Sequence, residues 1–316
     1  WEKIPLSITA MVVAVGLHLS GVLSAKEAFA GFVDPNVLLF MGMFVIGEAF
    51  FATGVAVGVG NVVHKFAKTE TSLLVAVMMI TGVLSGFLSN TGTAAVLIPV
   101  IIGICKKSGF KQTKLLMPLV FAAAMGGNIS LIGAPGNMIA QAGLQQAGLG
   151  SFNFFDYGLV GLPILIVGTI FYATIGKRFL PDAPSHQPDG AFEGNDDYSH
   201  VPSWKKWTAA IILILTVVAM IFEKQLGVKL YVSAWIGALV LVATNVISET
   251  AAVKSIDMKT IMLFAGSMAL GDAMVKTGTG SVIADIIVNS LGASPSPIVV
   301  LVVIFVLGVF MTNFMS

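Results

Sequence analysis

The chain has 316 residues, of which 56% are hydrophobic and only 10% are charged, and its formal net charge is +1. A soluble domain carries about 25% charged residues, so this composition excludes a water-soluble globular protein and indicates that lipid solvates most of the surface. The near-neutral charge gives no sign of a nucleic-acid partner. The single cysteine, Cys105, excludes an internal disulfide framework.

Apolar runs of membrane-spanning length follow one another along the chain and predict an all-α polytopic membrane protein. The expected spans are residues 5–24, 36–63, 156–176, 206–222, 230–248 and 260–289. Two longer runs, 71–105 and 114–148, carry polar or helix-breaking residues at their centres. A last run, 296–316, follows the breaker sequence "ASPSP".

Basic residues orient the spans, because they mark the cytoplasmic side of a cell membrane. They flank the one clearly polar stretch, 181–203, which we expect to be a cytoplasmic linker between two halves. They also stand at both ends of run 71–105, which therefore enters and leaves the membrane on the same side. The residues concerned are Lys65, Lys68, Lys106, Lys107, Lys111, Lys114, Lys177, Arg178, Lys205 and Lys206.

Run 71–105 is accordingly predicted to be a re-entrant helical hairpin with Ser89, Asn90 and Thr91 at its tip. Its arms of about 14–18 residues span roughly 21–27 Å, which places the tip deep in the hydrocarbon. Backbone groups freed there must be buried in protein or line a wet cavity. The carbonyl end of the first arm, with Ser85, suits a hard cation such as Na⁺, and the N–H end of the second arm suits an anion.

Run 114–148 contains "GGNISLIGAPGN" at 126–137. Its glycines and Pro135 predict that the helix unwinds into two half-helices. We expect the unwound loop to face the hairpin tip, with Gly133 offering a carbonyl and Pro135, Gly136 and Asn137 opening the second half-helix. Two other interpretations remain open: polar residues that only join helices, and a kink without a ligand.

The two halves of the chain match when one is shifted by 224 residues. Residues 9–24 align with 233–248, and 39–54 align with 263–278. The match predicts inverted repeats over 1–180 and 204–316, which is typical of secondary transporters. With a three-residue gap, "GFLS" aligns with "NFMS", so Ser316 is expected to open a second tip, and the chain is expected to be truncated at both ends. Shared positions include Phe40/Phe264, Gly42/Gly266, Gly47/Gly271, Thr53/Thr277 and Gly54/Gly278.

The repeat also pairs two intramembrane acids, Glu48 and Asp272. An ionisable residue within a span suggests function by default, here the binding of a cation or a proton. Pairing with helix ends or polar neighbours is an equally open interpretation.

The segments "SNTGTAAVLIP" (89–99) and "GGNISLIGAPGN" resemble the signature segments of the divalent anion:Na⁺ symporter family, the dicarboxylate and citrate carriers. The resemblance covers essentially the whole chain in order and implies a homodimer with a scaffold domain and a moving, elevator-type transport domain. Ala134 and Gly136 depart from the family pattern, which has threonine and proline there. By this resemblance the carboxylate would contact Ser89, Asn90, Thr91, Pro135, Gly136 and Ser316, and Na⁺ would bind at Ser85, Ser89, Asn90, Gly133 and Asn137.

These observations predict a secondary active transporter of the plasma or inner membrane that takes up a di- or tricarboxylate with Na⁺.

Neither of the two breaks, in runs 71–105 and 114–148, carries a lysine or arginine that could neutralise a bound dianion. Importing two negative charges against ~100 mV costs about 4.6 kcal/mol, so at least two Na⁺ are needed to cancel the charge. The alternatives are a cation/proton antiporter or oxyanion exporter, which Glu48 and Asp272 would serve, and a Na⁺-independent anion exchanger. No cofactor besides Na⁺ and no enzymatic activity are expected, since hydrolase and metalloprotease motifs are absent from the sequence.

Overall fold

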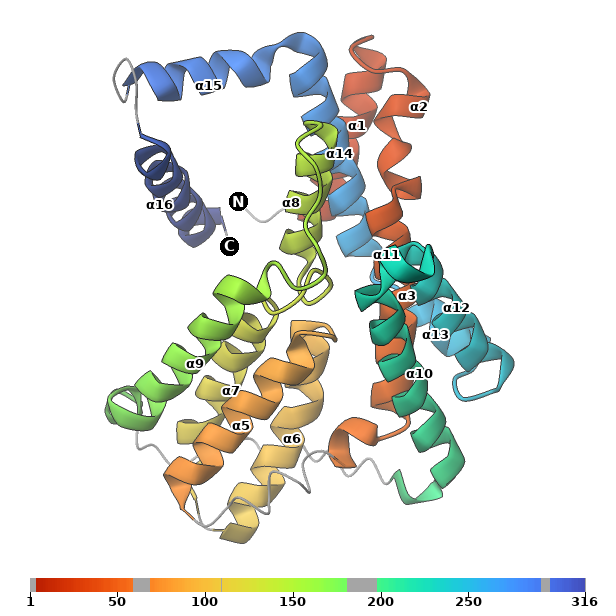
Figure 1. Ribbon diagram of the computed structural model, residues 1–316, viewed down its shortest axis with the longest axis vertical. Helices are drawn as coiled ribbons and strands as arrows, with labels where there is room; N and C mark the ends of the chain where they lie inside the picture. Colours follow the sequence, from red (N-terminus) through yellow and green to blue (C-terminus); the bar gives the residue numbers. More distant parts are fainter. Residues whose placement is uncertain (1–3, 59–68, 109, 181–197, 291–295, 316) are drawn as a thin grey trace. The chain divides into compact units, whose positions relative to one another are not determined.

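The computed structural model describes residues 4–58, 69–108, 110–180, 198–290 and 296–315, and every regular element within these ranges is a helix (Figure 1). The prediction of an all-α polytopic membrane protein is confirmed. The first half contains α1 (Leu6–Leu19), α2 (Ala25–Ala28), α3 (Pro35–Ala52), α5 (Glu70–Ser85), α6 (Asn90–Ser108), α7 (Thr113–Gly126), α8 (Pro135–Gln146) and α9 (Gly158–Thr174). The second half contains α10 (Ser203–Ile221), α11 (Glu223–Leu226), α12 (Leu230–Ala243), α13 (Glu249–Ser255), α14 (Met258–Thr277), α15 (Thr279–Ser290) and α16 (Pro297–Met315).

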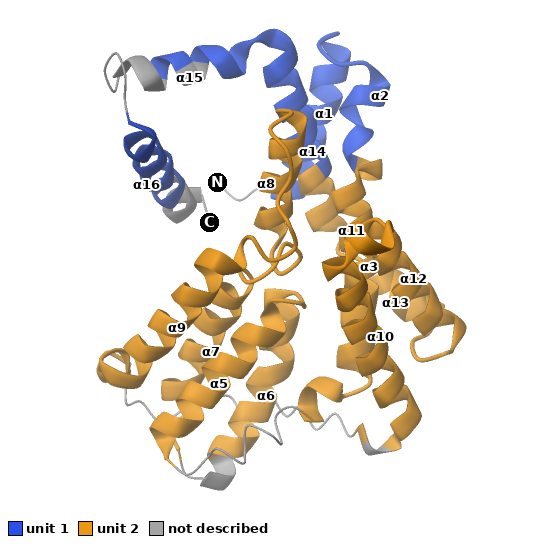
Figure 2. Ribbon diagram, viewed as in Figure 1, with its two compact units in different colours: residues 1–31, 265–316 blue, residues 32–264 orange. Residues whose placement is uncertain are grey.

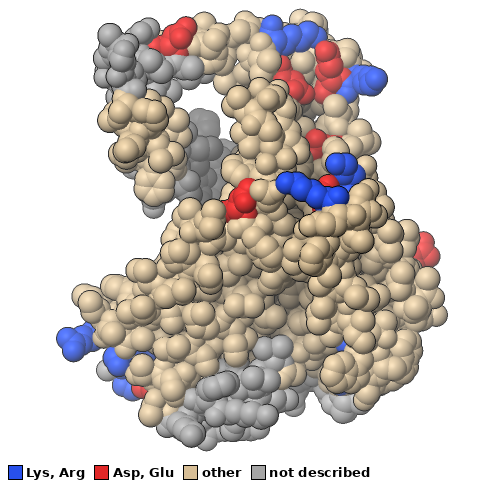
Figure 3. All heavy atoms as spheres, in the orientation of Figure 1, with Lys and Arg blue, Asp and Glu red and all other residues tan. Residues whose placement is uncertain are grey.

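Three of the described helices, α3, α10 and α14, are long and apolar enough to cross a membrane by themselves. Shorter apolar helices include both arms of the predicted hairpin, α5 and α6. Figure 3 shows few acidic or basic side chains along the described helical surfaces that it draws, and Lys and Arg side chains group near helix ends. A surface of this kind is suited to lipid.

The chain forms two compact units (Figure 2). The first unit comprises residues 1–31 and 265–316. In it, α14 packs closely on α1, where Gly266 lies against the backbone and methyl group of Ala10. Small residues make this close approach of two helices possible. The buried core of the unit consists of Ala14, Leu23, Ala28, Ala269 and Ala273.

The second unit, residues 32–264, contains two groups of helices. In the first group, α3 packs against α10, α12 and α13, and we call this group the α3 bundle. Gly42 of α3 lies against Ala234 of α12, and Gly237 of α12 lies against Thr216 of α10. Glycine at these crossings lets the helix backbones approach closely.

The second group of helices in this unit, α5, α6, α7 and α9, is the hairpin bundle. Helices α5 and α7 cross where Gly82 and Gly126 meet backbone to backbone, since a Cβ atom on Gly126 would collide with Gly82. The core beside this crossing is apolar throughout and closely packed. Its buried members are Leu73, Leu74, Val77, Met78, Leu97, Ile101, Ile104, Cys105, Leu115, Leu119, Ala122 and Leu165.

The stretches that align at a shift of 224 residues fold alike. Helix α1 covers Leu6–Leu19 and α12 covers Leu230–Ala243, which are the same positions in the alignment. Each helix is followed by a residue with positive φ, Gly21 at 76° and Asn245 at 56°. The next helix of each stretch begins after a serine, Ser24 or Ser248, whose hydroxyl accepts a hydrogen bond from the backbone N–H three residues later.

Helices α3 and α14 end within the predicted apolar runs 36–63 and 260–289, so neither run is one continuous helix. Helix α3 ends at Ala52 and α14 ends at Thr277, each one residue before or at an aligned Thr-Gly pair. Gly54 and Gly278 adopt φ values of 75° and 73°, which terminate a right-handed helix. The continuation of the first span beyond residue 58 and residues 181–197 of the predicted linker lie outside the described residues.

Candidate functional site

The predicted hairpin tip is a turn between two helices. Helix α5 ends at Ser85, residues 86–89 form the turn, and α6 begins at Asn90. The Ser89 hydroxyl accepts a hydrogen bond from the Gly92 N–H at 3.1 Å, which satisfies one free donor at the start of α6. The turn thus brings the carbonyl end of one helix beside the N–H end of the next.

The second predicted break is also a turn between two helices, α7 and α8. Helix α7 ends at Gly126 and α8 starts at Pro135, a residue well suited to the first helical position. The loop between them folds around Asn137, whose amide donates to the Gly127 and Ser130 carbonyls at 2.9 Å each. The Asn137 carbonyl in turn accepts from the Tyr157 hydroxyl at 2.8 Å. Asn137 therefore acts as an internal scaffold for the loop.

The loop is bonded to the hairpin turn. The Ser130 hydroxyl donates to the Gly86 carbonyl. Gly133 lies against the carbonyls of both Gly127 and Gly86, so a side chain there would push the two turns apart. The structure therefore places the two interrupted segments in direct contact within the second unit.

Asn90 is the centre of this contact. Its side-chain nitrogen, oriented to satisfy its neighbours, lies within hydrogen-bonding distance of the carbonyls of Ala123 (3.2 Å) and Gly133 (3.0 Å) and of the Ser85 hydroxyl (2.6 Å), and these three acceptors share its two N–H groups. The Ser85 hydroxyl donates to the Ala123 carbonyl at 2.7 Å. A Cβ atom on Gly127 would come within 2.5 Å of the Asn90 amide, so only glycine fits beside it.

This cluster collects oxygen atoms from three chain segments around one amide. Ser85, Ser130 and Asn137 are buried, while Ser89 and Asn90 are half-buried. Hydroxyl and carbonyl oxygens at the ends of interrupted helices are the ligand type that transporters use for Na⁺. Among the described residues, no group of three or more His, Cys, Asp or Glu side chains could hold a metal ion.

A small pocket of about 40 Å³ lies against the cluster, and we call it the tip pocket. Ser89, Gly133 and Pro135 form one side of it. Helix α3 supplies the other side with Phe40, Met43 and Phe44, and further apolar lining comes from Phe87, Leu88 and Ile132.

The other predicted site residues lie outside the hydrogen-bonded cluster. Thr91 and Gly136 are exposed at the starts of α6 and α8. Ser316 lies outside the described residues. The structure thus brings Ser85, Ser89, Asn90, Gly133 and Asn137 together and leaves Thr91 and Gly136 on the surface of the same region.

Sequence reasoning missed several residues of the site. Ser130 stands in the quoted loop, where its hydroxyl was a usable signal. The Ala123 carbonyl gave no signal in the sequence, because every residue has a backbone carbonyl. The Thr93 hydroxyl is buried without a hydrogen-bond partner, one helical turn from Asn90 on the same side of α6. A hydroxyl spaced three residues from Asn90 was a signal that could have been used.

Glu48 is half-buried on α3. It lies between Phe44, which lines the tip pocket, and Phe51, whose ring lies 2.6 Å from where a Cβ on Gly92 would be. Its helical position therefore places it beside the face of α3 that meets the hairpin. Asp272 is half-buried on α14, in the other unit.

Fold and site together define a polytopic α-helical membrane protein, with helix ends and polar side chains gathered at two breaks. The chain belongs to the citrate transporter family, whose model matches residues 1–316. The sequence segments resembled the dicarboxylate and citrate carriers of the divalent anion:Na⁺ symporter family. The match confirms the citrate transporter family and does not establish the Na⁺ symporter assignment.

Curated relatives carry the same general description. YfbS, an uncharacterized transporter of Escherichia coli, is 32% identical over 60% of the chain and 31% of its own length. Uncharacterized transporters of Haemophilus influenzae and Methanocaldococcus jannaschii are each 25% identical over 100% of the chain, and over 70% and 72% of their own lengths. The chain thus spans from about a third to about seven-tenths of these relatives.

Proposed function

We propose that the protein is a secondary active transporter that takes up a di- or tricarboxylate together with Na⁺ by an elevator-type movement. The observation that carries the proposal is the convergence of two interrupted helices on Asn90, where hydroxyl and carbonyl oxygens surround one amide. Such a junction is the expected place for a substrate and its coupling ion. Family membership supports a small anionic substrate, citrate being the named example.

The cation side of the site is supported by its oxygens. Ser85 Oγ and the carbonyls of Ala123 and Gly133 all lie within hydrogen-bonding distance of the Asn90 side chain. A Na⁺ ion that replaced the Asn90 N–H donors would find ready-made oxygen ligands, and the Asn90 amide oxygen could turn toward it. We assign Ser85, Ser89, Asn90, Gly133 and Asn137 to this side, with Asn137 holding the loop in place.

The anion side is supported by two helix N-termini. Helix α6 starts at Asn90 and α8 starts at Pro135, and each presents a positive dipole end. Pro135 has no N–H and the Asn137 N–H donates to the Ala134 carbonyl at 3.1 Å, so Gly136 supplies the N–H at the start of α8. Ser89, Asn90, Thr91, Pro135 and Gly136 would contact the carboxylate. The tip pocket between them, at about 40 Å³, is far below the roughly 300 Å³ at which small-molecule pockets begin.

The size of the tip pocket supports a movement between helix groups. One wall belongs to α3 and the opposite wall to the turns of the hairpin bundle and of the α7–α8 loop. Sliding of the hairpin bundle past α3 would widen the pocket without breaking the cluster around Asn90. The elevator-type mechanism and the homodimer rest on the sequence resemblance, and the cytoplasmic position of segment 181–203 rests on its flanking basic residues.

A cation/proton antiporter is the second candidate function. The position of Glu48, half-buried between Phe44 and Phe51, favours it, since an intramembrane carboxylate can carry a cation or a proton. In that function the same fold would exchange cations without a carboxylate. An oxyanion exporter or a Na⁺-independent anion exchanger would use the anion side alone.

Uptake into proteoliposomes of the full-length protein separates these functions. We expect inward Na⁺ gradients to drive accumulation of radiolabelled citrate or succinate, and a negative interior to leave uptake intact when at least two Na⁺ accompany each dianion. Cation flux driven by a pH gradient without any carboxylate would identify the antiporter instead. Citrate–citrate exchange without Na⁺ would identify an exchanger.

A further inference from the structure

A second and larger cavity lies in the same unit as the tip pocket. It has a volume of about 320 Å³ and lies between the start of α3, the end of α8, the loop that follows α8, and the α11–α12 turn. Asn36, Gln141, Gln145, Phe152, Glu223 and Lys229 are among its lining residues. We call it the outer cavity, because it lies at the end of α10 opposite the basic residues Lys205 and Lys206, which are expected in the cytoplasm.

The outer cavity and the tip pocket follow one another along the same two helices. On α3, Asn36 and Leu39 line the outer cavity, and Phe40 and Met43 line the tip pocket. On α8, Gln141 and Gln145 line the outer cavity, and Pro135 lines the tip pocket. On α8, six residues separate Pro135 from Gln141, which is between one and two helical turns, whereas on α3 the linings adjoin at the consecutive residues Leu39 and Phe40.

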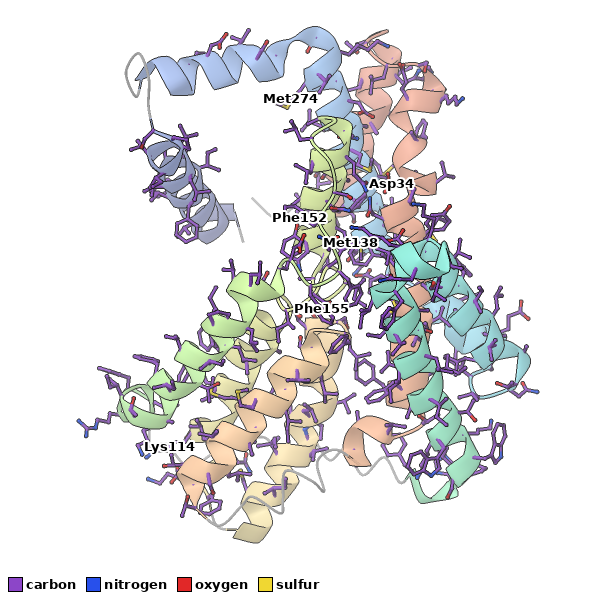
Figure 4. All side chains as sticks on the ribbon, in the orientation of Figure 1. Asp34, Lys114, Met138, Phe152, Phe155 and Met274 are labelled. Carbon is purple, nitrogen blue, oxygen red and sulfur yellow. The ribbon has the colours of Figure 1, made fainter. Side chains whose placement is uncertain are left out.

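Two buried apolar side chains lie where the two linings meet. Met138 lies between Pro135 and Gln141 on the same stripe of α8 and is fully buried (Figure 4). Leu39 of α3 is also buried. A long, flexible methionine side chain adapts readily to a changing environment, so Leu39 and Met138 form an apolar barrier that a small movement could open.

The two glutamines of the outer cavity are arranged as donors, while the Glu223 carboxylate is an acceptor in the same lining. The Gln141 side-chain oxygen accepts from the Phe152 N–H at 2.8 Å, and the Gln145 side-chain oxygen accepts from the Asn36 amide at 3.4 Å. With their oxygens engaged, both glutamines present NH₂ groups to a further acceptor. Gln141 is 4% exposed, so water competes little for its donors.

Lys229 adds a positive charge to these donors. Its ammonium lies 3.6 Å from the Glu223 carboxylate, beyond ordinary hydrogen-bonding distance, and its side chain is 70% exposed. An exposed pair of this kind is weak and leaves the ammonium donors for another anion. Two amide NH₂ groups and an ammonium around one cavity are suited to a carboxylate.

We propose that the outer cavity is an external binding site that holds the carboxylate substrate before it passes the Leu39–Met138 barrier to the tip pocket. This inference rests on the proposed function. The volume of about 320 Å³ is at the lower end of the range for small-molecule sites, which fits a small di- or tricarboxylate. The substrate then reaches the tip pocket along the shared faces of α3 and α8.

Protection from labelling tests the site directly. Ser151 lines the cavity and the native Cys105 is buried, so Ser151→Cys in the full-length protein places a reactive thiol at the cavity. We expect saturating citrate to slow its reaction with a membrane-impermeant maleimide at least threefold in right-side-out vesicles. The matched control is Leu149→Cys, which is exposed two residues away and does not line the cavity, and its labelling rate should not change.

The same labelling in an Asn90→Ala background distinguishes this inference from the proposed function. Protection at Ser151→Cys should persist there although uptake is lost, because the two sites are separate. Protection without citrate uptake by the unmodified protein would overturn the proposed function and leave the outer site standing. Citrate uptake with no protection at Ser151→Cys would overturn the outer site.

Lys229→Gln tests the charge. We expect it to raise KM for external citrate about tenfold with kcat unchanged, which is the effect of removing a binding contact and not a transport step. Lys26→Gln, a change at an exposed lysine outside the cavity, should leave both parameters unchanged. A fall in kcat with an unchanged KM in Lys229→Gln would contradict the proposal.

Discussion

Gly42 packs against Ala234: a Cβ atom on Gly42 would lie 2.8 Å from the Cβ of Ala234. The residues 224 positions away from these two form the same contact, since a Cβ on Gly266 would lie 2.7 Å from the Cβ of Ala10. Helix α3 of the first half thus packs on α12 of the second, and α14 of the second half packs on α1 of the first. Each contact joins a helix of residues 1–180 to a helix of residues 204–316, which is the arrangement we expect if the two predicted repeats fold together.

Substituting the glycine of this contact should destabilise the helix pair. Gly42→Leu places a side chain where the backbones of α3 and α12 already touch, and overpacking of this kind costs about 1–3 kcal/mol. The thermal unfolding midpoint in detergent should fall by several degrees. Gly16→Leu in α1 is the control, because no atom lies within 4 Å of a Cβ built there, and an equal fall in both variants would contradict the packing argument.

Gly278 tests the break between α14 and α15. It adopts φ 73°, and the nearest atom to a Cβ there would be the Ser281 Oγ at 3.9 Å, an ordinary contact, so Gly278→Ala should cost only backbone strain, about 1–2 kcal/mol. Gly278→Asn should cost less, because asparagine tolerates this conformation and Asn245 adopts it elsewhere in the chain. Thermal unfolding of the parent and the two variants should show stability falling in the order Gly, Asn, Ala at position 278. An alanine variant as stable as the parent would show that the break does not require a residue that tolerates positive φ.

The two helix breaks and the internal alignment could be predicted from the sequence, because their signals lie in the sequence itself. Breaks at 86–89 and 127–134 follow from Ser, Asn, Gly and Pro within apolar runs, and the 224-residue shift follows from matching letters. The ends of α3 and α14 at Thr-Gly pairs were not predicted from the sequence, because apolar residues continue beyond them. Hydropathy carries no information about the change of backbone φ that ends each helix. The outer cavity was missed because Asn36, Gln141 and Lys229 come from distant parts of the chain.

The ion pair between Lys276 and Glu27 gives a pH dependence. The backbone N–H of Ser24 (2.7 Å) and then the Lys276 ammonium (3.0 Å) lower the pKa of Glu27 to about 2 from an ordinary 4.5. A lowered carboxyl pKa stabilises the folded state fully above pH 4.5, and the contribution is lost as the pH falls through 4.5 toward 2. The difference in thermal midpoint between the parent and Glu27→Gln should therefore be constant from pH 5 to 8 and shrink below 4.5. A difference that does not change with pH would show that the charge on Glu27 is not responsible.

Asn90 is the residue on which uptake should depend most. In Asn90→Ala, the carbonyls of Ala123 and Gly133 lose a donor in a buried site, which costs about 1–3 kcal/mol of stability. We expect a protein that still folds, with unchanged helical content by circular dichroism and a single peak on size exclusion, but without carboxylate uptake.

Asn128→Ala is the matched control, because Asn128 lies in the adjacent turn and its amide makes only a local 3.5 Å contact with the Ala124 carbonyl. That variant should keep most of its uptake. Full uptake by Asn90→Ala would remove the junction of the two breaks from the transport mechanism, because no other side chain bridges Ser85, Ala123 and Gly133 among the residues that the structure describes.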